Sequence, residues 1–213
     1  MTYIMSDIHG ESDRFFKMLE LIHFEFDDHL YILGDVIDRG PDGISLIQFI
    51  MEQKNISLIL GNHEYMFFDA VQSPNDGYKE ALWLSNGGYE TFSAYKKLGK
   101  KEQIKILDFI ENLPDHIVIS SHSQDMLLVH GSPGDSIEQR IWERPNLMDL
   151  PLLGDTVVVV GHTPTIVFNR ENSSPMSIYY NNKFIDVDCG CGHSTPLKRL
   201  ACLRLDDMRE FYI

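Results

Sequence analysis

The chain has 213 residues, of which 43% are hydrophobic and 23% are charged, and its formal net charge is −14. This length and composition are typical of a globular protein with a full hydrophobic core, and they exclude an intrinsically disordered chain. So acidic a surface repels polyanions, and we therefore expect no nucleic acid and no anionic membrane as a partner. The longest strongly apolar stretch, Val157 to Val160, has only the length of a strand, whereas a membrane-spanning helix needs roughly 20 apolar residues.

The N-terminus and the cysteines give an expectation about the compartment. The first residues are strand-like and then polar, without the charged and apolar regions of a signal peptide, which predicts a cytoplasmic protein. The three cysteines, Cys189, Cys191 and Cys202, are an odd number in such a chain, so structural disulfides are not expected. Cys189 and Cys191 lack a second pair at a zinc-binding spacing, and we interpret them as small structural residues.

The N-terminal part of the chain alternates between short apolar runs and amphipathic segments. The apolar runs predict strands at Thr2–Met5, Leu30–Leu33 and Ile56–Leu60. Apolar residues at helical spacing predict a helix after each of the first two strands, one with Ser12 as its N-cap and one with Pro41 in its first turn. This alternation is typical of βαβ units.

Residues 65–113 are predicted to be helical throughout, with breaks at 73–77, at Gly87-Gly88 and at Gly99. We interpret this block as a cap inserted beside the sheet. Trp83, Asn86 and Tyr89 are candidates for a substrate rim, although for Trp83 and Tyr89 a place in the core of the cap is the favoured interpretation.

From His116 onward the chain is mostly β. A hairpin is predicted at His116–Ser120 and Met126–Val129, then an irregular stretch with Arg140, Trp142 and Arg144, and then a strand at Thr156–Val160. The tail predicts antiparallel strands at Ser177–Tyr180, Phe184–Val187, Leu200–Leu205 and Glu210–Ile213, with a turn at Asn181-Asn182. We therefore predict a single two-sheet α/β domain over residues 1–213, with the helical block as a cap.

Five of the predicted strands end in potential metal ligands. These residues are Asp7 and His9, Asp35, Asn62 and His63, His130, and His162. If the strands lie side by side in one sheet, their ends converge on a single edge. A histidine after one strand is commonly just a hydrogen-bonded loop residue, but five such coincidences favour one shared site.

The types of ligand indicate the class of ion. Carboxylates, an amide oxygen and imidazoles, with no thiolate nearby, suit manganese, iron or zinc in a mixed nitrogen and oxygen site. Asp35, on the central strand, is the natural bridge between two ions. Centres with ions roughly 3.5 to 4 Å apart serve phosphatases and nucleases, because they hold a nucleophile in line with phosphorus.

Other residues near these strand ends suit the binding and protonation of a phosphate ester. Arg39 follows Asp35 by four residues, and its guanidinium can bind phosphate oxygens through two donors. His63 follows Asn62 directly and can face the site without coordinating a metal. With Asp38 as its carboxylate partner, its protonated form would be favoured, and it could protonate the leaving oxygen.

Five motifs, in this order along nearly the whole chain, resemble one family. They are DIHG at Asp7 to Gly10, GDVIDRG at Gly34 to Gly40, GNHE at Gly61 to Glu64, VHG at Val129 to Gly131 and GHTP at Gly161 to Pro164. Together they resemble the phosphoprotein phosphatase branch of the calcineurin-like metallophosphoesterases, and most of all its small bacterial and bacteriophage, lambda-type, serine/threonine phosphatases. LWLSNGG at Leu82 to Gly88, IWER at Ile141 to Arg144 and FID at Phe184 to Asp186 extend the similarity.

The resemblance implies a calcineurin-like two-sheet sandwich, flanked by helices, and a role for each site residue. It implies that Asp7 and His9 bind a first metal, that Asp35 bridges, that Asn62, His130 and His162 bind a second, that Arg39 and Arg144 bind phosphate together with Asn62, and that His63 is the general acid, oriented by Asp38. It also implies direct attack on phosphorus by a metal-bound hydroxide. Spacing alone does not separate Arg144 from Arg140. His193, in the CGCGH stretch, is expected on the surface or at the rim of the site.

The predicted function is therefore that of a metal-dependent phosphomonoesterase acting on phosphoserine or phosphothreonine in a protein or peptide, with phosphotyrosine as a further substrate and Mn²⁺ as the favoured ion. One alternative is a symmetrical dinucleoside tetraphosphate hydrolase, since such enzymes share these motifs. Another is a catalytically silent binding module, against which the complete ligand set argues. The long C-terminal elements of eukaryotic members are missing, so regulatory subunits are not expected.

Overall fold

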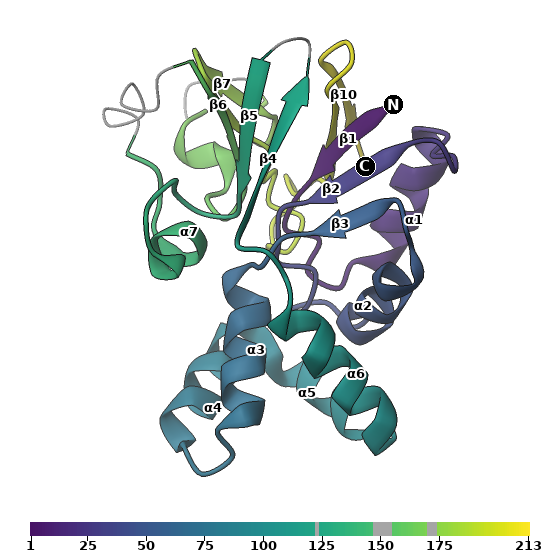
Figure 1. Cartoon of the computed structure of the whole chain (residues 1–213), viewed down its shortest axis with the longest axis vertical. Coiled ribbons are helices and arrows are strands. Elements are labelled where there is room, and N and C mark those ends of the chain that lie inside the picture. Colours follow the sequence, from purple (N-terminus) through teal and green to yellow (C-terminus); the bar gives the residue numbers. More distant parts are fainter. Residues whose placement is uncertain (122–123, 147–154, 170–173) are drawn as a thin grey trace.

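The computed structural model describes residues 1–121, 124–146, 155–169 and 174–213, and in these residues it contains two sheets (Figure 1). The first sheet has the order β10–β9–β1–β2–β3 and is built from β1 (Thr2–Met5), β2 (His29–Ile32), β3 (Ile56–Leu58), β9 (Ala201–Arg204) and β10 (Arg209–Tyr212). The second has the order β4–β5–β6–β8–β7 and is built from β4 (His116–Ser121), β5 (Gln124–Val129), β6 (Val157–Val160), β7 (Tyr179–Asn181) and β8 (Phe184–Asp186).

The alternation of side chains along each strand gives the first sheet two buried faces. In β1, Ile4 points to the second sheet and packs in a cluster with Leu128 and Val159, whereas Tyr3 and Met5 point the other way. The latter face is covered by helices α1 (Ser12–Leu21) and α2 (Gly43–Glu52), which lie beside β1–β3 in Figure 1. The predicted fold class, two sheets flanked by helices, is confirmed.

The strands that carry the candidate ligands do not share one sheet. β1, β2 and β3 run parallel in the first sheet, and β5 and β6 run parallel in the second. The expectation of a single sheet edge is therefore wrong, because local sequence patterns do not state which strands pair. The two sets of strand ends still meet, since the His130 Nδ1 atom after β5 lies 2.6 Å from the Leu33 carbonyl oxygen after β2.

Four helices and a π-helical turn form a layer at one end of the molecule (Figure 1). They are α3 (Asn62–Gln72), α4 (Gly77–Trp83), the π-helical turn η1 (Leu84–Gly88), α5 (Tyr89–Lys96) and α6 (Lys100–Glu111). We call residues 77–96 the cap segment. The predicted break at Gly87-Gly88 is present as a kink between two helices, at which Gly87 has a non-helical φ of 106°.

Several local predictions are corrected by the structure. Ser12, the predicted N-cap, is instead the first residue of α1, and Glu11 occupies the N-cap position. The Ser12 hydroxyl donates to Asp42 Oδ2 at 2.5 Å. α2 begins at Gly43, after Pro41. The tail turn is one residue later than predicted, because β7 ends at Asn181 and β8 begins at Phe184. The tail strands pair antiparallel as predicted, β7 with β8 and β9 with β10, and β8 also pairs parallel with β6, which precedes the tail.

The predicted irregular stretch before β6 contains a helix, α7 (Ile137–Trp142). Ser136 caps it, with its Oγ accepting a hydrogen bond from the Gln139 N–H at 3.2 Å. The sequence SIEQ at residues 136–139 carries this capping box, so the helix could have been predicted. A 3₁₀ turn, η3 (Thr165–Val167), follows β6, and residues 147–154 of the predicted stretch lie outside the described part. No helix in the described part is both long and apolar enough to cross a bilayer.

Candidate active site

A cavity of about 260 Å³ lies where the strand ends of the two sheets meet. It is lined by Asp7, Asp35, Arg39, Asn62, His63, Asn86, Trp142, Arg144, His162, Pro164, Asp188 and His193. His9, His130 and Asp38, which complete the predicted set, are buried directly behind this lining and contact it. The structure therefore brings all the predicted site residues together.

His9 presents an unpaired nitrogen to two carboxylates. Its Nδ1–H donates to the Ile37 carbonyl at 3.0 Å, which leaves Nε2 as the atom with the lone pair. This Nε2 has no hydrogen-bond partner among the described residues and lies 3.8 Å from Asp7 Oδ1 and 3.6 Å from Asp35 Oδ2. Burial lowers the pKa of His9 well below its usual value, so the ring is neutral. A lone pair facing two carboxylates fits a bound cation between them.

A second group of ligands lies on the other side of Asp35. His130 Nε2 lies 3.5 Å from Asp35 Oδ1 and 2.9 Å from Asn62 Oδ1, while its Nδ1–H is held by the Leu33 carbonyl. His162 donates its Nε2–H to the Trp142 carbonyl at 3.1 Å, which leaves Nδ1 free to coordinate. Burial lowers the pKa of His162 to about 3. Ligand atoms of Asp35, His130 and His162 all lie within 4.8 Å of one another.

The negative charge of the site also fits bound cations. Burial raises the pKa of both Asp35 and Asp188 well above the usual range, and repulsion from Asp7 adds to this effect. His63 lowers the pKa of Asp35 and Arg39 lowers that of Asp188, but neither outweighs burial. Asp188 was not among the predicted site residues. Its position after β8 could not be inferred from spacing, because β8 joins this sheet edge only through its pairing with β6.

The backbone at this site is strained in a consistent way. Left-handed φ values of 49° to 68° occur at six non-glycine site residues, namely Asp7, His9, Asp35, Asp38, Arg39 and His162. Each such residue costs about 1 to 3 kcal/mol, and the conformation persists only where the surroundings determine it strongly. Four of these residues, Asp7, Asp35, Arg39 and His162, line the cavity, and His9 and Asp38 lie directly behind it.

Glu64 is a buried acceptor that shapes the turn after β2. Its Oε1 accepts from the N–H groups of Val36 and Ile37 at 2.8 and 3.2 Å, and its Oε2 accepts from those of Asp35 and Gly61 at 2.8 and 3.2 Å. The side chain is fully buried. Glu64 therefore fixes the backbone of Asp35, which belongs to both groups of candidate ligands, and its sequence position in α3 did not reveal this role.

His63 and Asp38, the predicted general acid and its partner, form a buried hydrogen-bonded pair. Asp38 Oδ2 accepts a hydrogen bond from His63 Nδ1 at 2.7 Å, and His63 Nε2 lies 3.2 Å from an Arg39 guanidinium nitrogen and 3.9 Å from Asp35 Oδ2. Burial alone would lower the pKa of His63, but the Asp35 and Asp38 carboxylates outweigh it and raise that pKa. By position, His63 Nε2 also lies close enough to His9 and Asp35 to be a ligand, although its Nδ1 contact to Asp38 is that of an acid–base pair.

The structure shows that Arg144 belongs to the site and Arg140 does not, a distinction that their spacing in the sequence did not allow. Arg144 lines the cavity, and its Nη1 lies 3.4 Å from the His162 carbonyl. Arg140 points away, since it donates to the Gly134 carbonyl at 2.6 Å and pairs with Asp115 at 2.8 Å. His193 lies at the rim, as expected, and both arginines of the cavity, Arg39 and Arg144, lower its pKa together with burial, which has the larger effect.

The cap residues proposed for the rim divide between the two interpretations. Trp83 is fully buried in the cap core, and Asn86 lines the cavity. Tyr89 is 66% exposed and is not part of the cavity lining. Cys189 and Cys191 are buried and unbridged behind the site, consistent with small structural residues.

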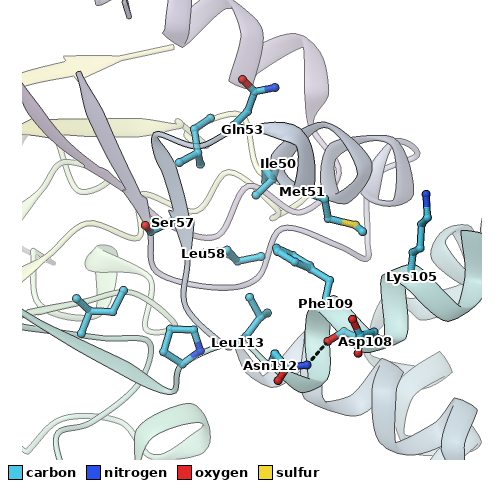
Figure 2. A pocket seen from close by; sticks show the side chains of 13 residues that line it. Ile50, Met51, Gln53, Ser57, Leu58, Lys105, Asp108, Phe109, Asn112 and Leu113 are labelled. Carbon is cyan, nitrogen blue, oxygen red and sulfur yellow. Dashed lines mark hydrogen bonds between the residues drawn. The ribbon is translucent and has the colours of Figure 1, made fainter. Parts of the chain in front are cut away.

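A larger groove, of about 560 Å³, lies elsewhere, between α2, β3 and α6 (Figure 2). Its lining includes Ile50, Leu58, Phe109 and Leu113, with Lys105 and Asp108 as its charged residues. It shares no lining residue with the cavity at the strand ends. Without a cluster of titratable groups it offers no comparable chemistry, so the smaller cavity is the candidate active site.

Comparison with known proteins agrees with this geometry. The profile of the calcineurin-like phosphoesterase family matches residues 2–195. The chain belongs to this family. The resemblance seen in the five motifs is thereby confirmed, and two of the relatives carry the name of a serine/threonine-protein phosphatase.

Relatives of this family member carry two kinds of name. The chain is 28% identical over 143 residues to a symmetrical bis(5'-nucleosyl)-tetraphosphatase of Nitrosomonas europaea, which covers 65% of this chain and 47% of that protein. It is 27% identical over 175 residues to serine/threonine-protein phosphatase 1 of Salmonella typhimurium, covering 76% and 78%. The chain spans less than half the length of the tetraphosphatases it matches.

A solved structure shows the same fold. The metallophosphoesterase from Sphaerobacter thermophilus superposes with a TM-score of 0.60, covering 99% of this chain and 86% of that one, at 19% sequence identity. This similarity supports the two-sheet architecture of the family.

Proposed function

We propose that this protein is a metal-dependent phosphomonoesterase that acts on phosphoserine and phosphothreonine in proteins or peptides, with phosphotyrosine as a further substrate. One observation carries the proposal. Two groups of candidate metal ligands share Asp35 at a cavity that is also lined by Arg39, Arg144 and His63, and His63 is paired with the buried Asp38. A shared ligand, a phosphate clamp and an acid are the parts that metal-assisted hydrolysis of a phosphomonoester needs.

The ligand set suits two divalent ions. Asp7, His9 and Asp35 would hold the first, and Asp35, Asn62, His130 and His162 the second. Oxygen and imidazole donors without thiolates favour Mn²⁺, with iron or zinc as alternatives. When bound, such ions supply Lewis acidity toward the phosphoryl oxygens and a water of lowered pKa for direct attack on phosphorus.

The side chains around this centre bind the phosphate and deliver a proton. Arg39 and Arg144 would hold the phosphoryl oxygens through charge-assisted hydrogen bonds, with Asn62 contributing its amide. His63 would donate the Nε2 proton to the leaving oxygen. Asp38, at 2.7 Å from Nδ1, keeps the other ring nitrogen protonated and the ring correctly oriented.

The contact between Arg39 and His63 suggests how the acid is loaded. An arginine N–H can donate only to an unprotonated Nε2, so the 3.2 Å contact corresponds to a neutral His63 ring. A phosphate that takes the Arg39 donors leaves Nε2 free to carry a proton, which the Asp35 and Asp38 carboxylates favour. Substrate binding would thus prepare the general acid.

Two observations favour a phosphorylated side chain over a dinucleotide. The cavity of about 260 Å³ is small beside the ~300 to 1,000 Å³ of pockets that enclose larger ligands. The chain carries a net charge of −14, which disfavours a ligand with four phosphates. The tetraphosphatase names among the relatives support symmetrical dinucleoside tetraphosphate hydrolysis as the second candidate.

A substrate panel tests the proposal. A phosphoserine peptide, a phosphotyrosine peptide, 4-nitrophenyl phosphate and diadenosine tetraphosphate are compared with Mn²⁺, Fe²⁺ or Zn²⁺ present. We expect release of inorganic phosphate from the peptides with the highest kcat/KM. A higher kcat/KM on diadenosine tetraphosphate, with two nucleoside diphosphates as products, would establish the second candidate instead.

A further inference from the structure

Asp38, the partner of His63, also receives a hydrogen bond from the cap segment. Its carboxylate is fully buried and accepts from Trp83 Nε1 at 3.1 Å to Oδ1 and 3.0 Å to Oδ2, in addition to the 2.7 Å bond from His63. In the described part of the chain, these two side chains are its hydrogen-bond donors. A buried carboxylate depends strongly on each donor it has, because water cannot replace one that is lost.

The same cap segment holds the backbone of this turn. The Asp38 N–H donates to Thr91 Oγ1 at 3.0 Å, and the Arg39 N–H donates to the Gly87 carbonyl at 2.9 Å. Asp38 and Arg39 both have left-handed φ values, 68° and 64°. A conformation of this kind persists only when its surroundings hold it, and here two backbone hydrogen bonds from the cap segment do so.

The indole of Trp83 is itself fixed in place. Its ring is fully buried and packs edge-on against Phe67, with centroids 5.2 Å apart. The chain passes so closely over it that a Cβ at Gly88 would lie 2.5 Å from Nε1. This close approach occurs in η1, next to the kink at which Gly87 has a non-helical φ of 106°. The sequence presents Trp83 as a cap core residue, but its donor atom faces the acid of the site.

We propose that Trp83 is a positioning residue for the general acid, acting through Asp38 on His63. Its N–H fixes the carboxylate, the carboxylate fixes the imidazole, and Nε2 is thereby aimed at the leaving oxygen, to which it gives its proton as the ester bond to phosphorus breaks. This inference rests on the proposed phosphomonoesterase function. It gives the cap segment a role in proton delivery.

The test compares two aryl esters that differ in their need for a proton. Nitrophenolate leaves unprotonated, whereas phenolate leaves more readily when it is protonated. In Trp83→Phe, we expect kcat on phenyl phosphate to fall about tenfold, a part of the ~10² to 10⁴ that a general acid contributes, and kcat on 4-nitrophenyl phosphate to fall by less than about twofold. Thr91→Val should likewise lower kcat on phenyl phosphate more than kcat on 4-nitrophenyl phosphate. Thr91→Ser, which keeps the hydroxyl group, should have the wild-type kcat on both esters.

Tyr95→Leu is the matched control. Tyr95 packs on the same Phe67 ring, at 5.0 Å, from within the cap core, so its loss should lower the melting temperature and leave the ratio of the two rates unchanged. The inference would be overturned if kcat fell equally on both esters in Trp83→Phe and Thr91→Val. It would also be overturned if kcat fell unequally on the two esters in Tyr95→Leu. Should Trp83→Phe fail to fold, the Thr91 pair decides. A wild-type protein inactive on both esters would overturn the proposed function, and this inference with it.

Discussion

The metal side and the acid side of the site are built in different ways. On the metal side, each candidate ligand follows a strand within a few residues, and four of them, Asp7, His9, Asp35 and His162, have left-handed φ values. On the acid side, Asp38 is held by Trp83 and Thr91, which lie 45 and 53 residues away in the chain. The first arrangement comes from the strand ends themselves, whereas the second depends on how the cap segment packs against them.

The largest effect is expected from a substitution on the metal side. Asp35→Asn removes the charge shared by both ligand groups, so we expect kcat/KM on 4-nitrophenyl phosphate with Mn²⁺ to fall about a thousandfold, equivalent to the several kcal/mol that bound metal supplies. Asp69→Asn is the control, because this carboxylate pairs with Lys79 on α4. Retention of more than a tenth of the wild-type rate in Asp35→Asn would contradict the shared ligand.

The acid side should respond through its pH profile. Asp38→Asn removes a carboxylate that raises the pKa of His63, so the protonated ring is lost at a lower pH. Because the protonated ring is the acid, we expect the fall in kcat at high pH to begin at a lower pH than in the wild type. At neutral pH, kcat on phenyl phosphate should fall about a hundredfold. An unmoved or upward-shifted limb would show that Asp38 does not act on His63.

Glu64 holds the backbone that leads from Asp35 on the metal side to Asp38 on the acid side, and Glu64→Gln tests this support. Each Glu64 oxygen accepts two backbone N–H groups, and glutamine has only one such oxygen, so Glu64→Gln leaves two buried donors unpaired. We expect the free energy of unfolding to fall by about 2 to 4 kcal/mol and Mn²⁺ affinity about thirtyfold.

Glu102→Gln offers a control for that variant. Glu102 accepts the Gly99 N–H at 3.0 Å at the start of α6, where it is exposed to solvent. Glu102→Gln should lower the free energy of unfolding by well under about 1 kcal/mol and leave the affinity for Mn²⁺ unchanged. Equal losses for the two variants, measured by urea unfolding and calorimetric titration, would mean that Glu64 acts only as a helix cap.

The smallest effect concerns the two arginines. Arg144→Lys keeps the charge but loses the planar fork, and we expect KM for a phosphoserine peptide to rise about tenfold. Arg140→Lys should leave KM unchanged, since Arg140 donates to Gly134 and Asp115 outside the cavity. Steady-state kinetics measures KM for both variants. A rise of KM in Arg140→Lys alone would contradict the assignment of Arg144 as a phosphate-binding residue.

The sequence was informative where structure is local and silent where it is not. Asp7, Asp35 and His162 could be predicted because apolar runs mark the strands that end just before them. That these strands belong to two sheets could not, because strand pairing depends on contacts between distant segments. The donor roles of Trp83 and the fourfold acceptor role of Glu64 were missed for the same reason, since each arises from packing across tens of residues.

The most direct measurement is the number of metal ions that bind per chain. Metal-free protein is titrated with Mn²⁺ by calorimetry, and the metal content after dialysis is measured by elemental analysis. If Asp35 joins the groups around His9 and His130 as a shared ligand, the wild type should bind two ions per chain, and hydrolysis of 4-nitrophenyl phosphate should follow their occupancy. Binding of one ion or none, with activity independent of added metal, would contradict the account.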